Sequence, residues 1–354
     1  SAVFLKGPIG PGLALTTAVT LSVADREVDW LRGLRPVSGL IVTALAVAPW
    51  LYAIEHATEG QFLQQSVGRD FFSKILGAQE AHGAPPLYYL ALAFLTFWPG
   101  SLFLVPAVIG GWRRRALPAV RFLLAWLLPA WIGLELVPTK LPHYALPLYP
   151  ALALLAAMAI IENSPPRWAR IASMLLWSVA TLAITAGLVV LPIRLGSGVS
   201  AIGVVSAIAL LVLAAVLLLR CHEPWRITAL LAAMSVALVI SVASFVVPDL
   251  DRLWLSRAIA TMIAAHPPAP GGLVVIGYNE PSLVFLLNGN FKTGVADALV
   301  AAGDEALVMT RMAGDFERIL ASRGLSGERI DSVSGTDYSN GQQMTLTLYK
   351  IEPK

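Results

Sequence analysis

The side chains best suited to chemistry lie together in the stretch KLPHYALPLYP, residues 140–150. Lys140, His143 and Tyr144 supply a cation, an imidazole and a phenol within five residues, and long apolar runs adjoin the stretch on both sides. Ionisable groups are costly to place at a membrane boundary, so such a cluster predicts a functional site. The alternative is a membrane anchor, because Lys and Tyr are amphipathic and common at membrane interfaces. The three prolines of the stretch exclude one regular helix, because proline has no backbone donor.

Two further ionisable residues lie next to predicted membrane boundaries. Glu135 lies about one helical turn inside the outer boundary, where a carboxylate needs a partner, and Lys140 is the nearest cation in the sequence. A structural ion pair is therefore preferred over a direct role in chemistry, and both remain open. Lys6 precedes Gly7 and Pro8 where an outward loop enters a predicted helix, which leaves its ammonium at the boundary.

The segment at residues 55–85 is a long, polar loop between two apolar runs. Apolar residues recur in its first part, from 62 to 76, at helical spacing, which predicts an amphipathic helix in the plane of the interface. Arg69 and Lys74 on this helix would meet lipid headgroups, or they would bind a phosphate at the outer surface, where arginine supplies two parallel hydrogen bonds.

Patterns for metal ligands and nucleophiles are sparse. Glu80 and His82 are two residues apart, and with His56 and His143 they could hold a divalent ion, but no HxxxH or CxxC spacing supports a metal site. Glu80 and His82 remain the candidates, and no cofactor is assigned. The single cysteine, Cys221, excludes an intramolecular disulfide, and no GxSxG motif is present.

The composition indicates a membrane protein. The 354 residues are 57% hydrophobic and 13% charged, and the mean hydropathy is +0.72. Soluble domains carry about 25% charged residues, so this chain has half the usual share. The net charge of +3 gives no indication of nucleic-acid binding, because the basic residues lie in short loops.

About eight apolar stretches of near-spanning length are predicted as transmembrane helices. The loops between them alternate in charge: ten basic residues fall in one set of four short loops and five in the other set. Basic loops stay in the cytoplasm, so this bias places residues 140–150, the loop at 55–85 and everything after about 248 on the outer side. Tyr88 and Tyr89 are expected in an interfacial aromatic belt rather than at a ligand. The predicted helices cover residues 8–24, 37–54, 86–111, 117–138, 145–162, 169–191, 200–219 and 227–247.

The last hundred residues have a different character, because charges and glycines become more frequent and the apolar runs shorten to strand length. We predict a small α/β domain outside the membrane, so the chain divides into a transmembrane region at 1–247 and an extracytoplasmic domain at 248–354. No glycine-rich phosphate loop precedes a helix, which argues against a nucleotide site. Strands are predicted at 272–277, 306–310 and 344–349, and helices at 281–287 and 316–325.

Three motifs resemble one family. Lys6-Gly-Pro, the stretch from Gln79 to Tyr89, and above all KLPHYALPLYP look like the second half of the bacterial ArnT-like glycosyltransferases, of the protein-O-mannosyltransferase superfamily. The resemblance implies a polytopic α-helical protein of the GT-C type in the bacterial cytoplasmic (inner) membrane, with its C-terminal domain in the periplasm. It further implies transfer of a sugar, with inversion, from a polyprenyl-phosphate donor to lipid A, another glycan or a protein at the outer leaflet.

The resemblance also implies roles for single residues. Lys140 and Tyr144 would sit by the donor phosphate, with Arg69 and Lys6 as further cations, because fixed cations and a phenol stabilise the charge on a leaving phosphate. Inversion needs a carboxylate base, which in the family lies on the first outward loop. The present chain starts within an apolar run, so we expect that base upstream of it and no base within it. Residues that would line the site are His143, Glu135, Glu80 and His82.

Two other classes of protein remain open. A lipid-phosphate or sugar transporter would also line a pathway with outward cations, but it would show inverted repeats and discontinuous helices in corresponding halves, and the sequence shows neither. A non-catalytic membrane scaffold, whose outer domain binds a partner, is the third class. An Asp or an Asp-Glu pair after a first spanning helix upstream of this chain would favour the enzyme.

Overall fold

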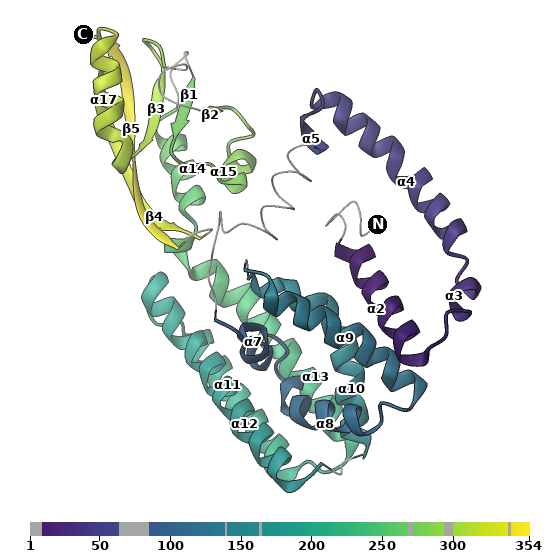
Figure 1. The fold of residues 1–354 in the computed structure, drawn as a ribbon. Helices are drawn as coiled ribbons and strands as arrows, with labels where there is room; N and C mark the ends of the chain where they lie inside the picture. Colours follow the sequence, from purple (N-terminus) through teal and green to yellow (C-terminus); the bar gives the residue numbers. More distant parts are fainter. Residues whose placement is uncertain are drawn as a thin grey trace. The chain divides into compact units, whose positions relative to one another are not determined.

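The computed structural model describes residues 9–63, 85–138, 140–162, 165–267, 272–293, 300–338 and 341–354 (Figure 1). The chain forms two compact units, one of Ser1–Thr185 with Ala209–Ala237 and the other of Ala186–Ile208 with Leu238–Lys354. The boundaries between the two units fall inside three long helices and do not coincide with residue 247. The expected domain boundary after residue 247 therefore stays a prediction.

Six helices in the described part of the chain are long and apolar enough to cross a membrane. In each of these helices, only 6% to 39% of an apolar segment of 18 residues is buried. Most of the apolar side chains therefore face away from the protein interior. A large exposed apolar surface promotes aggregation in water, whereas lipid solvates it. The exposed apolar side chains therefore favour a membrane location. The six are α4 (Pro36–Ala57), α9 (Pro118–Leu136), η3 with α10 (Pro142–Glu162), α11 (Arg167–Leu195), α12 (Ala201–Arg220) and α13 with its η4 and η5 continuation (Pro224–Asp249).

The other two predicted spans are shorter or broken. Helix α2 (Ile9–Asp25) has 17 residues. The prediction of one continuous helix at 86–111 is wrong, because the chain forms α7 (Tyr88–Thr96), the 3₁₀ helix η2 (Gly100–Phe103) and α8 (Leu104–Arg113) instead. Pro99 has no N–H to donate and disfavours a helical residue before it, and Gly100 weakens the helix further.

Side chains of α11 stabilise this break between α7 and α8. Trp177 Nε1 donates to the Pro99 carbonyl at 3.0 Å, and Trp98 Nε1 donates to Thr181 Oγ1 at 2.9 Å. The two indole rings stack with centroids 6.4 Å apart and planes 12° from parallel. The Pro99 carbonyl and the two indole N–H groups are therefore paired, as buried polar groups must be.

The apolar core of the first unit lies between α7, α8, α9 and α10. Val120 and Leu123 of α9 pack there with Leu152 and Leu155 of α10. Ion pairs close one end of the bundle: Arg121 Nε lies 2.6 Å from Asp25 Oδ1 between α9 and α2, and Arg114 pairs with Glu162 between the ends of α8 and α10. These are helix ends that the charge bias of the loops predicts on the cytoplasmic side. The short elements are α3 (Trp30–Gly33) and α5 (Gln61–Leu63).

The C-terminal part of the second unit is built on one five-stranded mixed sheet with the order β2-β1-β3-β5-β4. β1 runs parallel to β2 and β3, whereas β5 is antiparallel to both β3 and β4. The strands are β1 (Leu273–Ile276), β2 (Lys292–Thr293), β3 (Glu305–Met309), β4 (Leu325–Asp337) and β5 (Gln342–Pro353).

Helices cover both faces of this sheet, which gives three layers. Leu307 and Leu348 point to one face, where α14 (Leu255–Ala265) and α15 (Pro281–Leu286) pack. Val308 and Tyr349 point to the other face, which α17 (Ala313–Ser322) covers. The alternation follows from the two-residue period of a strand. The remaining short helices are η6 (Asp251–Leu253) and η7 (Thr310–Met312).

The predicted α/β domain is confirmed, and three of its elements were not predicted. The missing elements are α14, β2 and β4. β4 carries polar residues along both faces and is exposed over most of its length, so it reads as a loop. The predicted helix at 316–325 is displaced, since α17 ends at Ser322 and residue 325 begins β4.

A buried group of hydroxyls joins α14 to the loop after β1 and to α15. Ser256 Oγ lies 2.8 Å from Tyr278 Oη and 2.8 Å from Ser282 Oγ. Burial raises the pKa of Tyr278 to about 12, against a smaller opposing effect of the Ser256 hydrogen bond. The phenol is therefore neutral at physiological pH and acts as a structural hydrogen-bonding group.

Candidate functional site

The residues 140–150 form the turn between α9 and α10. Leu141 is extended, Pro142–Leu148 form the 3₁₀ helix η3, and α10 begins at Tyr149. The prediction that this stretch is not one regular helix is confirmed. Since α9 ends at Leu136, Lys140 follows directly after a spanning helix, and His143 and Tyr144 lie on η3.

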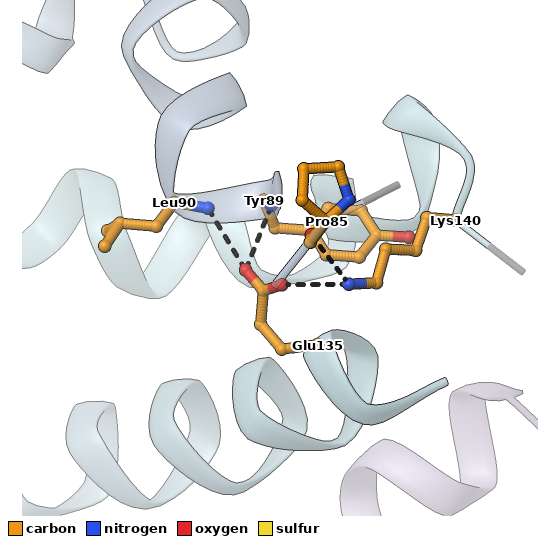
Figure 2. Close-up of polar contacts among 5 residues, drawn as sticks. All are labelled: Pro85, Tyr89, Leu90, Glu135 and Lys140. Atoms are coloured by element: carbon orange, nitrogen blue, oxygen red, sulfur yellow. Dashed lines mark hydrogen bonds and ion pairs between the residues drawn. The ribbon is translucent and has the colours of Figure 1, made fainter. Parts of the chain in front are cut away.

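The Lys140 side chain is almost entirely buried, with 5% of its surface exposed. Its Nζ donates to the carbonyl of Pro85 at 3.1 Å and lies 3.5 Å from Oε2 of Glu135 (Figure 2). The predicted ion pair of Glu135 and Lys140 is confirmed. A lysine this deeply buried needs such partners, because an uncompensated buried charge is strongly destabilising.

The other oxygen of Glu135 caps helix α7. Oε1 accepts hydrogen bonds from the backbone N–H groups of Tyr89 at 3.0 Å and Leu90 at 3.2 Å, in the first turn of α7 (Figure 2). Helix α7 has no cap of its own, because its N-cap residue is Leu87, whose side chain accepts no hydrogen bond. Leu87 is also in the left-handed region, with a φ of 68°, which is unfavourable for a bulky residue. Glu135 therefore supplies from α9 the acceptor that the sequence before α7 lacks.

Two positive groups face the Glu135 carboxylate. Lys140 contributes one positive charge and Glu135 one negative charge. The N-terminus of a helix such as α7 adds roughly half a positive charge from its aligned peptide dipoles. The carboxylate thus lies between two positive groups, which compensate its negative charge.

His143 and Tyr144 lie side by side on η3. Their ring centroids are 4.8 Å apart, with the planes nearly perpendicular at 83°. His143 is exposed and Tyr144 is partly buried. The Tyr144 backbone N–H donates to the Leu141 carbonyl at 3.1 Å, which fixes the start of the 3₁₀ turn. The structure therefore holds an imidazole and a phenol one turn after the Lys140 ammonium.

The other predicted site residues lie outside the described residues. These are Lys6, Arg69, Glu80 and His82, together with Lys74 and nearly all of the predicted amphipathic helix at 62–76. Within the described ranges, no group of three or more His, Cys, Asp or Glu side chains is arranged to hold a metal ion.

The expectation of an aromatic belt is wrong for Tyr89. Its side chain is 1% exposed, and its ring packs edge-on against Tyr88 with centroids 5.1 Å apart. A belt residue must face the lipid interface, whereas the contacts of Glu135 draw the start of α7 against the end of α9.

Sequence reasoning missed two partners at this site, the Pro85 carbonyl and the N-terminus of α7. The run Pro85-Pro86-Leu87 contains the signal, because a helix that follows it has no Ser, Thr, Asp or Asn to cap it. Such a helix needs an acceptor from elsewhere. Glu135, at the end of α9, fills that role.

Comparison with known proteins identifies what this arrangement is similar to. No family model matches the chain. The undecaprenyl phosphate-alpha-4-amino-4-deoxy-L-arabinose arabinosyl transferase of Pseudomonas paraeruginosa is 30% identical over 139 residues, which cover 38% of this chain and 25% of that protein. The protein of the same name from Pseudomonas savastanoi pv. phaseolicola is 33% identical over 124 residues, or 35% and 23% of the two chains. The matched region spans about a quarter of the length of these relatives.

Among solved structures, ArnT from Cupriavidus metallidurans bound to undecaprenyl phosphate superimposes with a TM-score of 0.70 at 17% identity, over 98% of this chain and 66% of that one. The apo state of the same protein gives 0.69 at 18% identity. The predicted fold, a polytopic GT-C helical protein with a small C-terminal α/β domain, is confirmed, and so is the resemblance to the ArnT-like proteins. Together with the six candidate spans, these matches identify an integral inner-membrane protein.

Proposed function

We propose that this chain acts in a membrane glycosyltransferase that moves a sugar from a polyprenyl-phosphate donor to an acceptor at the outer leaflet. The observation that carries the proposal is the fold, which 98% of the chain shares with a protein crystallised with undecaprenyl phosphate. The relatives named as arabinosyl transferases support the same reaction class.

The donor phosphate would lie at Lys140 and Tyr144. An ammonium has three N–H donors, and two of those on Lys140 meet Pro85 and Glu135. The third can donate to a phosphate oxygen while the polyprenyl tail lies in lipid. When the bond between the sugar carbon and the phosphate oxygen breaks, negative charge collects on the phosphate, and a fixed cation and a phenol stabilise it. Arg69 and Lys6 would add further cations, and His143 would line the site.

The orientation proposed here places residues 140–150, the loop at 55–85 and the domain at 248–354 in the periplasm, with 1–247 forming the transmembrane region. The two-to-one bias of basic residues supports it. The ion pairs Asp25–Arg121 and Arg114–Glu162 support it as well, because they join helix ends that the bias assigns to one side. The acceptor would be lipid A, another glycan or a protein, reached from the same side as the donor.

A transfer assay tests the proposal against the other two classes. Membrane vesicles that contain the full-length protein, including the expected carboxylate base, would receive undecaprenyl phosphate carrying labelled 4-amino-4-deoxy-L-arabinose, the donor in the names of the relatives. We expect the label to move to an acceptor and unlabelled undecaprenyl phosphate to be released, with a lower rate for Tyr144→Phe. Label that crosses the bilayer while still attached to the lipid would identify a transporter instead. A label that neither reaches an acceptor nor crosses the bilayer would favour a non-catalytic scaffold.

A further inference from the structure

We propose that Glu135 is a positioning residue of the donor site, which acts through Lys140 and fixes the start of α7 at the same time. This inference rests on the donor-phosphate role proposed above for Lys140. Glu135 itself is not expected to touch the donor, because both of its oxygens already have partners within the protein.

The first support is that one carboxylate serves two elements. Oε1 binds the N–H groups of Tyr89 and Leu90, and Oε2 binds the Lys140 ammonium (Figure 2). Each oxygen of the carboxylate therefore has its own partner. Glu135 thus connects the end of α9 with the start of α7 and with the turn that leads into η3.

The second support is that the contacts form a closed ring. Lys140 also binds the carbonyl of Pro85, two residues before Leu87, the N-cap of α7. The chain therefore runs from Pro85 into α7, from α7 through Glu135 to Lys140, and from Lys140 back to Pro85. The ammonium cannot shift without disturbing the entry into α7, where Leu87 already holds an unfavourable backbone conformation.

The physical reason for such a device is the flexibility of lysine. Its four-carbon side chain adopts many rotamers, so an ammonium that must meet a phosphate at a fixed place needs contacts that select one of them. Glu135 supplies a charged contact, and the Pro85 carbonyl a neutral one. Loss of the charged contact would leave a buried cation with a single acceptor among the described residues.

Two substitutions separate the two roles of Glu135. Glu135→Gln keeps a side-chain carbonyl that can accept from Tyr89 and Leu90, but it removes the charge that holds Lys140. Glu135→Ala removes both contacts. Glu162→Gln is the matched control, because Glu162 also forms an ion pair at a helix end, with Arg114, but lies far along α10 from Lys140.

The decisive measurement is a double-mutant cycle of Glu135→Gln and Lys140→Met. Affinity is measured for undecaprenyl phosphate and for undecaprenol, with the chain in detergent at fixed salt. We expect Glu135→Gln to weaken binding of the phosphate lipid about tenfold when Lys140 is present, but less than about twofold when Lys140 is already methionine. Undecaprenol binding and the Glu162→Gln control should stay at the wild-type level.

Hydrogen exchange gives a second readout that needs no ligand. The amides of Tyr89 and Leu90 should exchange near the wild-type rate in Glu135→Gln and faster in Glu135→Ala, because only the alanine variant lacks the cap. This result would also show that the glutamine variant keeps its fold at α7, so that a loss of binding reports on Lys140.

Three results would contradict the inference. Tighter binding by Glu135→Gln would mean that Glu135 competes with the phosphate for Lys140. Equal losses with and without Lys140 would mean that Glu135 acts independently of it, and unchanged binding by Glu135→Gln would mean that it has no role at the donor. If Lys140→Met itself binds the phosphate lipid like the wild type, the proposed donor role of Lys140 fails, which is a separate outcome.

Discussion

The Lys140 ammonium lies in an environment that few lysines occupy in proteins. It is buried, it pairs with a carboxylate at 3.5 Å, and it binds a backbone carbonyl at 3.1 Å. Buried ion pairs contribute little net stability, because the loss of hydration offsets their attraction, so a retained pair often has another use. Here the use we assign is to hold one cation at a membrane boundary where a lipid phosphate can reach it.

The sequence predicts part of this site and not the rest. Glu135 and Lys140 are five residues apart, so the need of each for a partner predicts their pairing. The hydrogen bond from Tyr89 to Glu135 joins residues 46 positions apart, so the sequence before α7 indicates that an acceptor is needed but not that Glu135 supplies it. Lys6, Arg69, Glu80 and His82 stay predictions, because they lie outside the described residues.

At the residue scale, Ser256→Ala should destabilise the C-terminal domain. Ser256 is the partner of the buried Tyr278 hydroxyl, and a buried polar group left without its partner costs about 1–3 kcal/mol. We expect a lower apparent Tm for the full chain in detergent. Ser322→Ala is the control, because Ser322 is exposed and donates only within its own helix, to the carbonyl of Ile319. Equal Tm values for the two variants would contradict a structural role for the hydroxyl group.

At the element scale, the break between α7 and α8 shows how tertiary contacts override an apolar run. Hydropathy alone favours one helix through residues 86–111, because every part of it is apolar. Pro99 prevents this, and Trp177 then donates a hydrogen bond to the Pro99 carbonyl at the break. The spans without an internal break of this kind, such as α12, were predicted to within a few residues, since length and apolarity are sufficient there.

Trp177→Phe tests whether those contacts stabilise the break. The substitution keeps an aromatic ring but removes the N–H that binds the Pro99 carbonyl, so we expect a loss of about 1–3 kcal/mol, measured as a lower apparent Tm. Trp168→Phe on the same helix is the control, because Trp168 is 63% exposed while Trp177 is 1% exposed. The account of the break would be wrong if Trp168→Phe lowered the Tm as much as Trp177→Phe.

At the scale of the whole molecule, the sequence predicts the fold class because lipid sets a simple rule for length and apolarity. It does not predict how the helices pack. Helix α2 contacts α9, and Asp25 pairs with Arg121 between them. These segments lie about a hundred residues apart, and no pattern in either sequence predicts that they meet. β4 shows the same limit in the sheet, since its pairing with β5 decides its structure more than its own polar residues do.

Labelling with an impermeant thiol reagent tests the proposed topology. The single native cysteine, Cys221, follows α12 in a loop predicted to be cytoplasmic, so it should remain unlabelled in intact spheroplasts. A cysteine introduced at Ser322, an exposed position at the end of α17, should be labelled in a Cys221→Ser background. Labelling of Cys221 together with protection of position 322 would reverse the orientation and move the proposed site to the cytoplasmic side.

The most direct test of the central claim is the difference in affinity for undecaprenyl phosphate and undecaprenol, measured for the wild type, Lys140→Met and Tyr144→Phe. We expect the wild type to prefer the phosphate lipid. Lys140→Met should lose about 1.5–3 kcal/mol of that preference, or roughly tenfold to a hundredfold, and Tyr144→Phe about 1 kcal/mol, because the first removes a charge and the second only a hydroxyl group. Equal affinity of all three proteins for the phosphate lipid would contradict the donor site and leave residues 140–150 as a membrane anchor.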